Sequence, residues 1–218
     1  MTSASDSTRR RYHSPRRQQQ AADTRAAILA AATRLFSERG WAATSIRDVA
    51  EAAQVSVQAV YTSVGSKADL LREATDVAVV GDAQPVPLAE RPEFAALGQG
   101  DARSRALAAA RLLLEVQQRT LRLRSALREA AASDAQLAEQ WRDNELRRRI
   151  NIEQAGTLVA GRALSDRERD GLWAVCGIEV YQLLTELAGW TAEQYQDWMT
   201  DTILRLLDLT PANRRRST

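Results

Sequence analysis

The sequence predicts an all-α protein with two unequal parts. From Asp23 onward, apolar residues recur at the spacing of one helix face. Several of these segments begin with Ser, Thr or Asp, which cap helix N-termini, and some end at glycine, which caps C-termini. The helices are short over residues 22–80 and long over residues 81–210. We therefore expect an N-terminal three-helix domain with a helix-turn-helix, followed by a larger helical domain.

The composition argues against an enzyme. Among the 218 residues, Cys176 is the only cysteine and His13 the only histidine. One chain therefore cannot form a disulfide, a metal site based on cysteine or histidine, or a nucleophile activated by histidine. No pair of carboxylates stands out. We expect no catalytic residue, no metal and no cofactor.

Neither a membrane span nor a secretory signal is visible. No apolar run approaches the roughly 18 residues that a spanning helix needs. The arginines near the N-terminus are followed by no apolar segment of the kind found in signal peptides. The sequence therefore predicts a cytoplasmic protein without a membrane partner.

Charge alone does not identify a nucleic-acid-binding protein. Residues 1–80 hold 11 basic and 8 acidic side chains, whereas residues 81–218 hold 19 and 20. All basic residues except Lys67 are arginine, which together with the abundant alanine is typical of a GC-rich coding bias. The asymmetry is modest, so the partner has to be inferred from motifs.

The first helix is predicted to follow a disordered arm. Residues 1–21 lack apolar periodicity and are rich in Ser, Arg and Gln, which predicts a disordered basic arm. Residues 211–218 are expected to form a disordered tail. The helix from Asp23 should end near Gly40, since glycine readily adopts the left-handed C-cap. Its apolar face consists of Ile28, Leu29, Ala32, Leu35 and Phe36.

Two short helices are predicted next. Ser45 can cap the first, and Asp48, three residues on, can reach back as in a capping box, although Glu or Gln is usual there. After a short break, Ser56 can cap a second helix over residues 57–63. Both helices are too short to be stable alone, so they require flanking helices as a packing base.

The second short helix is expected to turn Val60 and Tyr61 inward. Gly65 should end it, and Ser66 can cap a fourth helix over residues 67–80. Two short helices joined by a tight turn form a helix-turn-helix. On spacing alone, a generic helical bundle is the alternative.

The larger part is predicted to begin with a linker. Residues 81–100 hold three of the five prolines. Beyond it we expect five helices, three of them opened by a capping box at Ser133, Ser165 or Thr191. Their expected ranges are 101–119, 120–132, 135–159, 166–187 and 192–209.

About fifty residues between Thr24 and Leu71 follow one consistent pattern. The pattern is Ile28-Leu29-x-Ala31-Ala32-x-x-Leu35-Phe36-x-x-x-Gly40-Trp41, then Thr44-Ser45-Ile46-Arg47-Asp48-Val49-Ala50, Val55-Ser56, Val60-Tyr61 and Ser66-Lys67-x-x-Leu70-Leu71. It resembles the DNA-binding domain of the TetR family of transcriptional regulators, and it favours a helix-turn-helix over the generic bundle. Gln54 departs from the family's usual glycine in the turn, with strain if its φ is positive. Val64 stands where a phenylalanine is common.

The resemblance implies that the second short helix is a recognition helix in the major groove of double-stranded DNA. Gln58 suits an adenine edge, Val57 suits a thymine methyl group, and Arg47 could reach a guanine edge or a phosphate. Tyr61 and Lys67 could bind phosphate, with a core aromatic and a solvated lysine as the alternatives. The arginines of the N-terminal arm could also contact DNA, or the arm could be a plain tail. The candidate DNA-binding residues are Thr44, Ser45, Arg47, Val57, Gln58, Ala59, Tyr61, Thr62, Ser63 and Lys67.

The resemblance also implies a homodimer whose last two helices form a four-helix interface. This symmetry would place two recognition helices about 34–36 Å apart on a palindromic operator. A small hydrophobic or aromatic effector would bind in the larger domain and release the DNA by a population shift, which makes the chain a repressor. The alternative is a ligand-independent DNA-binding dimer whose C-terminal domain serves only dimerisation or protein partners.

Seven residues are candidates for lining the effector pocket, and for each the alternative is filled core. A redox sensor is a further possibility for Cys176, with a buried inert thiol as the favoured alternative. The seven residues are Leu113, Val116, Leu123, Trp141, Ile152, Trp173 and Cys176.

Overall fold

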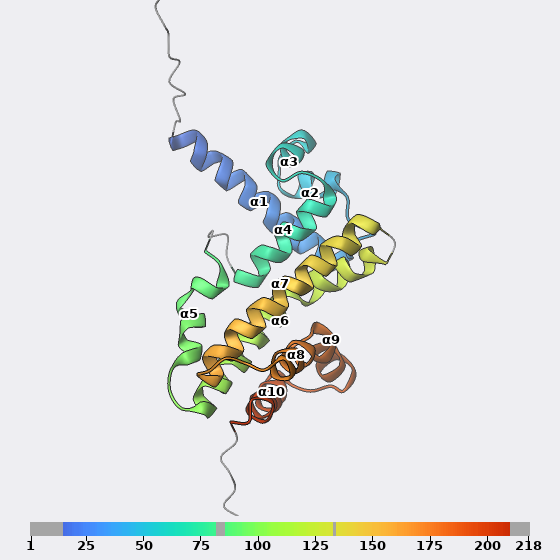
Figure 1. Cartoon of the computed structure of the whole chain (residues 1–218). Coiled ribbons are helices and arrows are strands. Elements are labelled where there is room, and N and C mark those ends of the chain that lie inside the picture. The colour runs from blue at the N-terminus through green and yellow to red at the C-terminus, as the bar shows by residue number, and fades with distance from the viewer. Residues whose placement is uncertain (1–14, 82–85, 133, 210–218) are drawn as a thin grey trace, which may run out of the picture.

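A computed structural model of the chain describes residues 15–81, 86–132 and 134–209. These residues form helices joined by turns, which confirms the predicted all-α class (Figure 1). No described helix combines the length and the apolar character needed to cross a membrane. The elements are α1 (Pro15–Arg39), α2 (Ile46–Ala52), α3 (Val57–Ser63), α4 (Lys67–Val80), η1 (Leu88–Glu90), α5 (Pro92–Ala95), η2 (Ala96–Gly98), α6 (Ala102–Ala131), α7 (Ala135–Ala160), α8 (Asp166–Val175), α9 (Ile178–Gln182), the π-helical turn η3 (Leu183–Leu187) and α10 (Ala192–Leu206).

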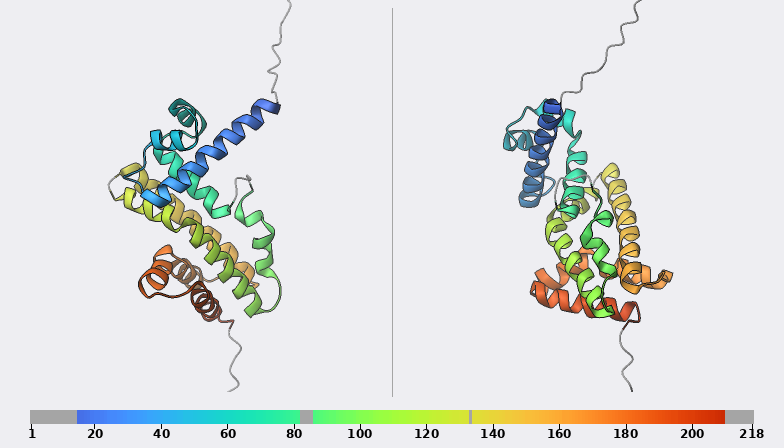
Figure 2. Two further views of the ribbon diagram at one scale, coloured as in Figure 1. Left: turned by 180° about the vertical axis from the view of Figure 1, so that it is seen from behind. Right: turned by 90° about the vertical axis from the view of Figure 1, so that its left-hand side faces the viewer.

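The helices are arranged around a long antiparallel pair, α6 and α7. Helices α1 to α4 lie on one side of this pair and α8 to α10 on the other (Figures 1 and 2). Side chains of α1 to α4 form the first core with Leu123 and Leu127 of α6 and Leu137 of α7. The second core joins Phe94 and Leu97 to the first half of α6 and to α8, α9 and α10. Because α6 contributes to both cores, a shift of α6 must disturb both.

The N-terminal arm is shorter than predicted. Helix α1 begins at Pro15, so the prediction of disorder was wrong for residues 15–21, and residues 1–14 lie outside the described residues. Proline fits the first turn of a helix, and Arg, Gln and Ala are good helix formers. These residues extend the helix without burying any apolar side chain, which is why apolar periodicity did not detect them.

The predicted linker and the predicted break in α6 were also wrong. The described part of the linker, residues 86–100, packs Phe94 and Leu97 into the second core. Helix α6 runs without interruption through Thr120, whose hydroxyl donates to the Val116 carbonyl one turn earlier. The Thr120 hydroxyl is therefore hydrogen-bonded within a continuous helix and does not cap the N-terminus of a new helix.

The predicted helix over residues 166–187 is divided. Its start is as expected, because Ser165 and Glu168 form a capping box. It breaks at Gly177, which adopts an extended conformation, and a Cβ there would lie 3.1 Å from the Ala174 carbonyl oxygen. At the break, the carbonyl groups of Cys176 and Gly177 accept hydrogen bonds from another helix, although the Gly177 carbonyl also accepts one from the Tyr181 N–H.

Candidate nucleic-acid interface

Helices α2 and α3 begin at the predicted caps. The Ser45 hydroxyl accepts a hydrogen bond from the Asp48 backbone N–H, and the Asp48 carboxylate accepts one from the Ser45 N–H. These hydrogen bonds from Ser45 hold the pKa of Asp48 below its usual value. The Ser56 hydroxyl likewise accepts from the Ala59 N–H at the start of α3. The capping residues therefore fix where both short helices start.

The turn between α2 and α3 contains a strained residue. Gln54 has a φ of +57°, in the left-handed region where a side chain is disfavoured. This is the position at which the sequence departs from the glycine usual in similar proteins. The backbone N–H of Gln54 still donates to Glu51, and that of Val55 donates to Ala50, so the turn is hydrogen-bonded despite the strain.

We expect Gln54→Gly to stabilise the protein by about 0.5–1 kcal/mol, because glycine adopts a positive φ without steric cost. The measurement is urea-induced unfolding at one protein concentration. Gln54→Ala is the matched control and should leave the free energy of unfolding nearly unchanged, since alanine retains the Cβ. A Gln54→Gly variant no more stable than Gln54→Ala would show that the turn is not strained.

Helix α3 buries one face and exposes the other. Val60 is fully buried in the first core, whereas Val57 and Tyr61 are 39% and 51% exposed. Gln58 and Thr62 are also exposed and lie one turn apart, with the Thr62 hydroxyl donating to the Gln58 carbonyl at 2.8 Å. The prediction that Tyr61 faces inward was therefore wrong, and its ring is available to a partner. Ala59 and Ser63 are partly exposed at the edges of this face.

A contact between distant residues, not predicted from the sequence, fixes α3 relative to α1 and α4. The Arg25 guanidinium on α1 donates to the backbone carbonyl of Ser63, the last residue of α3. It also pairs with Glu73 of α4 at 2.5 Å. Arg25 therefore neutralises the negative C-terminal end of α3 and joins three helices. No local motif marks this arginine, because its partners lie 38 and 48 positions away.

Two of the predicted phosphate contacts are engaged within the protein. Thr44 is buried, and its hydroxyl lies within hydrogen-bonding distance of the carbonyl oxygens of Leu35 and Gly40. The prediction that this hydroxyl binds phosphate was wrong, because the hydroxyl already forms hydrogen bonds with carbonyl groups at the C-terminal end of α1. The Lys67 ammonium donates to the Trp41 carbonyl at 2.6 Å and lies 4.1 Å from the centre of the Trp41 ring.

Lys67 consequently has both a structural contact and unused donors. Burial lowers its pKa, while the nearby Asp48 carboxylate raises it. An ammonium group has three hydrogens, so one bond to Trp41 leaves others for a phosphate. Ser45 and Arg47 are exposed beside it at the start of α2. These groups and the outward face of α3 form one candidate surface.

The predicted effector pocket is not assembled. Leu123 is fully buried in the first core, and Trp141 packs against the same core. Leu113, Ile152 and Cys176 belong to the second core, while Val116 and Trp173 are partly buried on α6 and α8. The prediction that these seven residues line one site was therefore wrong, because five of them are divided between two cores.

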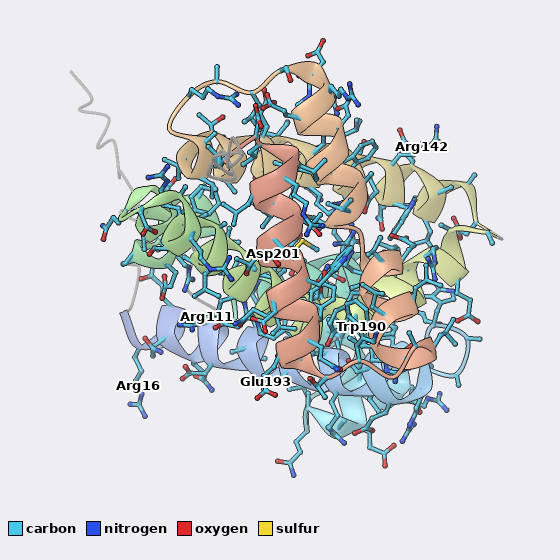
Figure 3. All side chains as sticks on the ribbon, turned by 90° about the horizontal axis from the view of Figure 1, so that it is seen from below. Arg16, Arg111, Arg142, Trp190, Glu193 and Asp201 are labelled. Carbon is cyan, nitrogen blue, oxygen red and sulfur yellow. The ribbon has the colours of Figure 1, made fainter. Side chains whose placement is uncertain are left out.

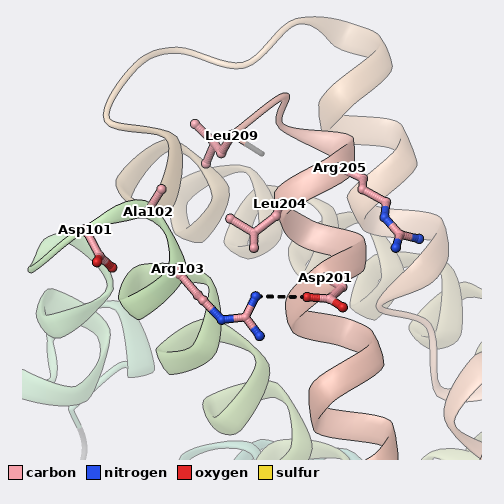
Figure 4. Close-up of a pocket in the computed structure, with 7 residues that line it drawn as sticks. All are labelled: Asp101, Ala102, Arg103, Asp201, Leu204, Arg205 and Leu209. Carbon is pink, nitrogen blue, oxygen red and sulfur yellow. Dashed lines mark hydrogen bonds and ion pairs between the residues drawn. The ribbon is translucent and has the colours of Figure 1, made fainter. Parts of the chain in front are cut away.

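One pocket among the described residues lies away from these candidates. It has a volume of about 400 Å³ and lies where the start of α6 meets α10, with Arg103 and Asp201 paired at 3.2 Å (Figure 4). None of the seven predicted residues lines it. Both members of that pair are largely exposed, so this is a surface depression rather than an enclosed site.

The second core contains polar atoms that lack partners. Gln117 is 2% exposed and donates through Nε2 to the carbonyl oxygens of Cys176 (3.3 Å) and Gly177 (3.4 Å), at the break after α8. Its Oε1 atom and the Tyr195 hydroxyl are buried without a hydrogen-bond partner. Burial raises the pKa of Tyr195, and the neighbouring Gln117 side chain opposes part of that rise. Buried polar groups of this kind are uncommon and call for an explanation.

Cys176 lies beside this polar group. It is buried, and burial raises the pKa of its thiol to about 12. The thiol is therefore protonated at neutral pH, which favours the inert-thiol interpretation over a redox sensor.

Comparison with known proteins identifies the helix-turn-helix. Residues 28–74 match the family of bacterial regulatory proteins described as the tetR family. A curated HTH-type transcriptional repressor of Mycobacterium tuberculosis and an HTH-type transcriptional regulator of Mycobacterium bovis are each 51% identical to this chain over 51 residues. That segment is 23% of this chain and 27% of each relative, so it spans about a quarter of the relatives' length.

Solved structures extend the likeness to most of the chain. A TetR-family transcriptional regulator from Rhodococcus sp. has a TM-score of 0.66 at 19% identity, covering 85% of this chain and 99% of that one. The multidrug binding protein EbrR, complexed with imidazole, has a TM-score of 0.54 at 23% identity, covering 94% and 97%. At these identities the likeness concerns the fold. Residues 28–74 therefore match the tetR-family helix-turn-helix, and most of the chain shares the fold of these solved structures.

Proposed function

We propose that this chain is a transcriptional repressor that binds a palindromic operator in double-stranded DNA as a homodimer. The observation that carries the proposal is the outward face of α3, where Val57, Gln58, Tyr61 and Thr62 are exposed together. A valine and a tyrosine left half-exposed on a short, firmly capped helix suit contact with thymine methyl groups and the DNA backbone. The exposed Arg47, beside them on α2, supplies positive charge.

Selection of bound sequences from a random duplex pool, at a stated salt concentration, tests this function. The expected result is one palindrome with half-sites about one DNA turn apart. Arg47→Glu should abolish recovery, because it places a negative charge against the DNA backbone, while sedimentation shows an intact dimer. If wild-type protein that is folded and dimeric recovers no sequence, the proposed function is wrong.

The proposed dimer forms through α8, α9, η3 and α10. On this surface Leu183 and Leu187 are 56% and 79% exposed, one turn apart in η3. Trp190 and Trp198 pack edge to face nearby, and both remain partly exposed. Large apolar side chains exposed together are typical of an interface. A two-fold axis through this surface would present both α3 helices to the same side of the DNA.

The proposed effector is a small hydrophobic or aromatic molecule with at least one hydrogen-bonding group. Support comes from the second core, where Gln117 Oε1 can accept a hydrogen bond and the Tyr195 hydroxyl can donate one. The Gln117 side chain already binds two carbonyl groups at the break between α8 and α9, which a ligand could widen. The similar fold of EbrR, a multidrug binding protein, is consistent with such a role. Bound there, the ligand would displace α6, which also contributes to the first core.

We expect Tyr195→Phe to raise the free energy of unfolding by about 1 kcal/mol, because it removes a buried hydroxyl without a partner. Urea denaturation measures this. Tyr181→Phe is the control: the Tyr181 ring lies 5.0 Å from that of Tyr195, and its hydroxyl is not one of the orphaned atoms. Compounds that release the duplex from wild-type protein should fail to release it from Tyr195→Phe.

The ligand-independent alternative is favoured by one observation, namely that five of the seven predicted pocket residues belong to two separate cores. In that case the C-terminal domain serves only dimerisation or protein partners. Tyr195→Phe distinguishes the two: a variant destabilised by more than the control would show that the hydroxyl has a structural partner. The effector proposal would then lose its support, and the DNA-binding proposal would not be affected.

A further inference from the structure

The first turns of α1 stand apart from both cores. Every residue from Arg16 to Asp23 is exposed, and Ile28 is the first buried residue of the helix. At 1.5 Å per residue, the stretch before Ile28 is about 20 Å long. It projects from the body of the molecule in Figure 1 and in the left view of Figure 2, and Arg16 points away from the rest of the chain (Figure 3).

The direction of this projection is tied to the recognition helix. Arg25, on the turn before Ile28, binds the last carbonyl of α3 and pairs with Glu73 of α4. The projecting end of α1 and helix α3 lie at the same end of the molecule, opposite α10, in each view (Figures 1 and 2). DNA held against α3 would therefore pass near this segment.

The chemistry of the projection suits an anionic, hydrophilic partner. Its first turn has no acidic residue, and no ion pair within the described residues involves Arg16 or Arg17. Asp23 is the only acid in residues 16–24, and its carboxylate accepts a hydrogen bond from Gln19 of the same helix. No side chain in this stretch is both apolar and larger than alanine, so neither a membrane nor an apolar protein groove is a suitable partner.

We propose that residues 16–23 of α1 form an additional DNA-backbone contact, in which Arg16 and Arg17 bind phosphates outside the base pairs read by α3. The inference rests on the proposed DNA-binding function and extends the contact beyond the helix-turn-helix. A helix without a packed face is marginal in water, so a line of phosphates would also stabilise these turns. In a dimer, the contact would occur once at each outer flank of the palindrome.

The test is a two-by-two comparison of protein and DNA. The protein is the full chain, either wild type or Arg16→Gln/Arg17→Gln. The DNA is a duplex carrying the selected palindrome, either with ten flanking base pairs on each side or trimmed flush to the half-sites. Fluorescence anisotropy over a salt series measures the affinity and its salt dependence. Arg111→Gln/Arg167→Gln is the matched control, since both arginines are exposed and lie on other helices.

On the flanked duplex, the double variant should bind at least about tenfold more weakly than wild type. The slope of its log affinity against log salt should be smaller in magnitude than that of wild type by about 3 to 4, because the dimer loses four phosphate contacts. On the trimmed duplex, the two proteins should bind equally, and the control should match wild type on both. Equal affinity and slope on the flanked duplex would overturn the inference while leaving the proposed function intact. Failure of wild type to select any duplex would overturn both.

Discussion

Gln58→Ala is expected to weaken binding to the selected operator by between about 30-fold and 10⁴-fold. A glutamine paired with an adenine edge contributes about 1–3 kcal/mol of discrimination, and a symmetric dimer loses the contact twice. Gln58 is exposed on α3, and alanine is a good helix former, so the fold should be unaffected. Fluorescence anisotropy at fixed salt, with operator and scrambled duplexes, measures both affinity and specificity.

The control for this substitution is Gln118→Ala. Gln118 is also exposed but lies on α6, away from the candidate DNA surface. It should leave the affinity for the operator unchanged. Gln58→Ala should still bind scrambled duplex with the weak, salt-dependent affinity of wild type, because phosphate contacts remain. A variant that retains full preference for the operator would remove Gln58 from the base-reading residues.

The second large effect is expected from Glu145→Gln, which should lower the free energy of unfolding by about 2–4 kcal/mol. Glu145 on α7 pairs with Arg124 of α6 and, at 2.8 Å, with Arg148. The three side chains are only 13–17% exposed. Glutamine has nearly the same volume but no charge, so two guanidinium groups would remain poorly hydrated without the carboxylate that pairs with both of them.

The position of this charge cluster explains why its loss should be costly. Arg148 also donates to the Trp173 carbonyl on α8 at 2.9 Å, so the cluster connects α6, α7 and α8. Burial lowers the pKa of Arg124, whereas Glu145 raises it. Removing one partner of such a group leaves the desolvation cost in place and abolishes the attraction that offsets it.

Urea denaturation at one protein concentration measures this effect, because dimerisation makes stability depend on concentration. Asp201→Asn is the control. Its partner Arg103 is 69% exposed and Asp201 itself 48%, so that pair should contribute less than about 1 kcal/mol. Equal losses for the two variants would show that water screens the Glu145 cluster as effectively as it screens a surface pair.

Local hydrogen bonding explains what could be predicted about the helix-turn-helix. Ser45, Ser56 and Ser66 each cap a helix through a backbone N–H three residues away, and each cap was predicted. Gln54 was singled out as the position where a side chain replaces the usual glycine, and its φ is positive. Such features involve residues close in sequence, so their geometry can be inferred from residue type and spacing.

The effector site could not be predicted in the same way. Apolar residues on α6, α7 and α8 have the same periodicity whether they fill a core or line a pocket, and the structure divides five of the seven candidates between two cores. The polar group formed by Gln117 and Tyr195 was missed, because the two residues lie on different helices far apart in sequence. An isolated glutamine in a helix gives no local signal that it is buried.

By itself, the sequence determined the all-α class, the position of the helix-turn-helix and its resemblance to the DNA-binding domain of the TetR family. Only the tertiary structure decided that Thr44 is buried while Tyr61 is exposed, that α6 is continuous, and that Arg25 fixes the end of α3. The physical reason is the range of the interactions. Caps and turns are hydrogen bonds between residues a few positions apart, whereas burial and ion pairing depend on which distant segments pack together.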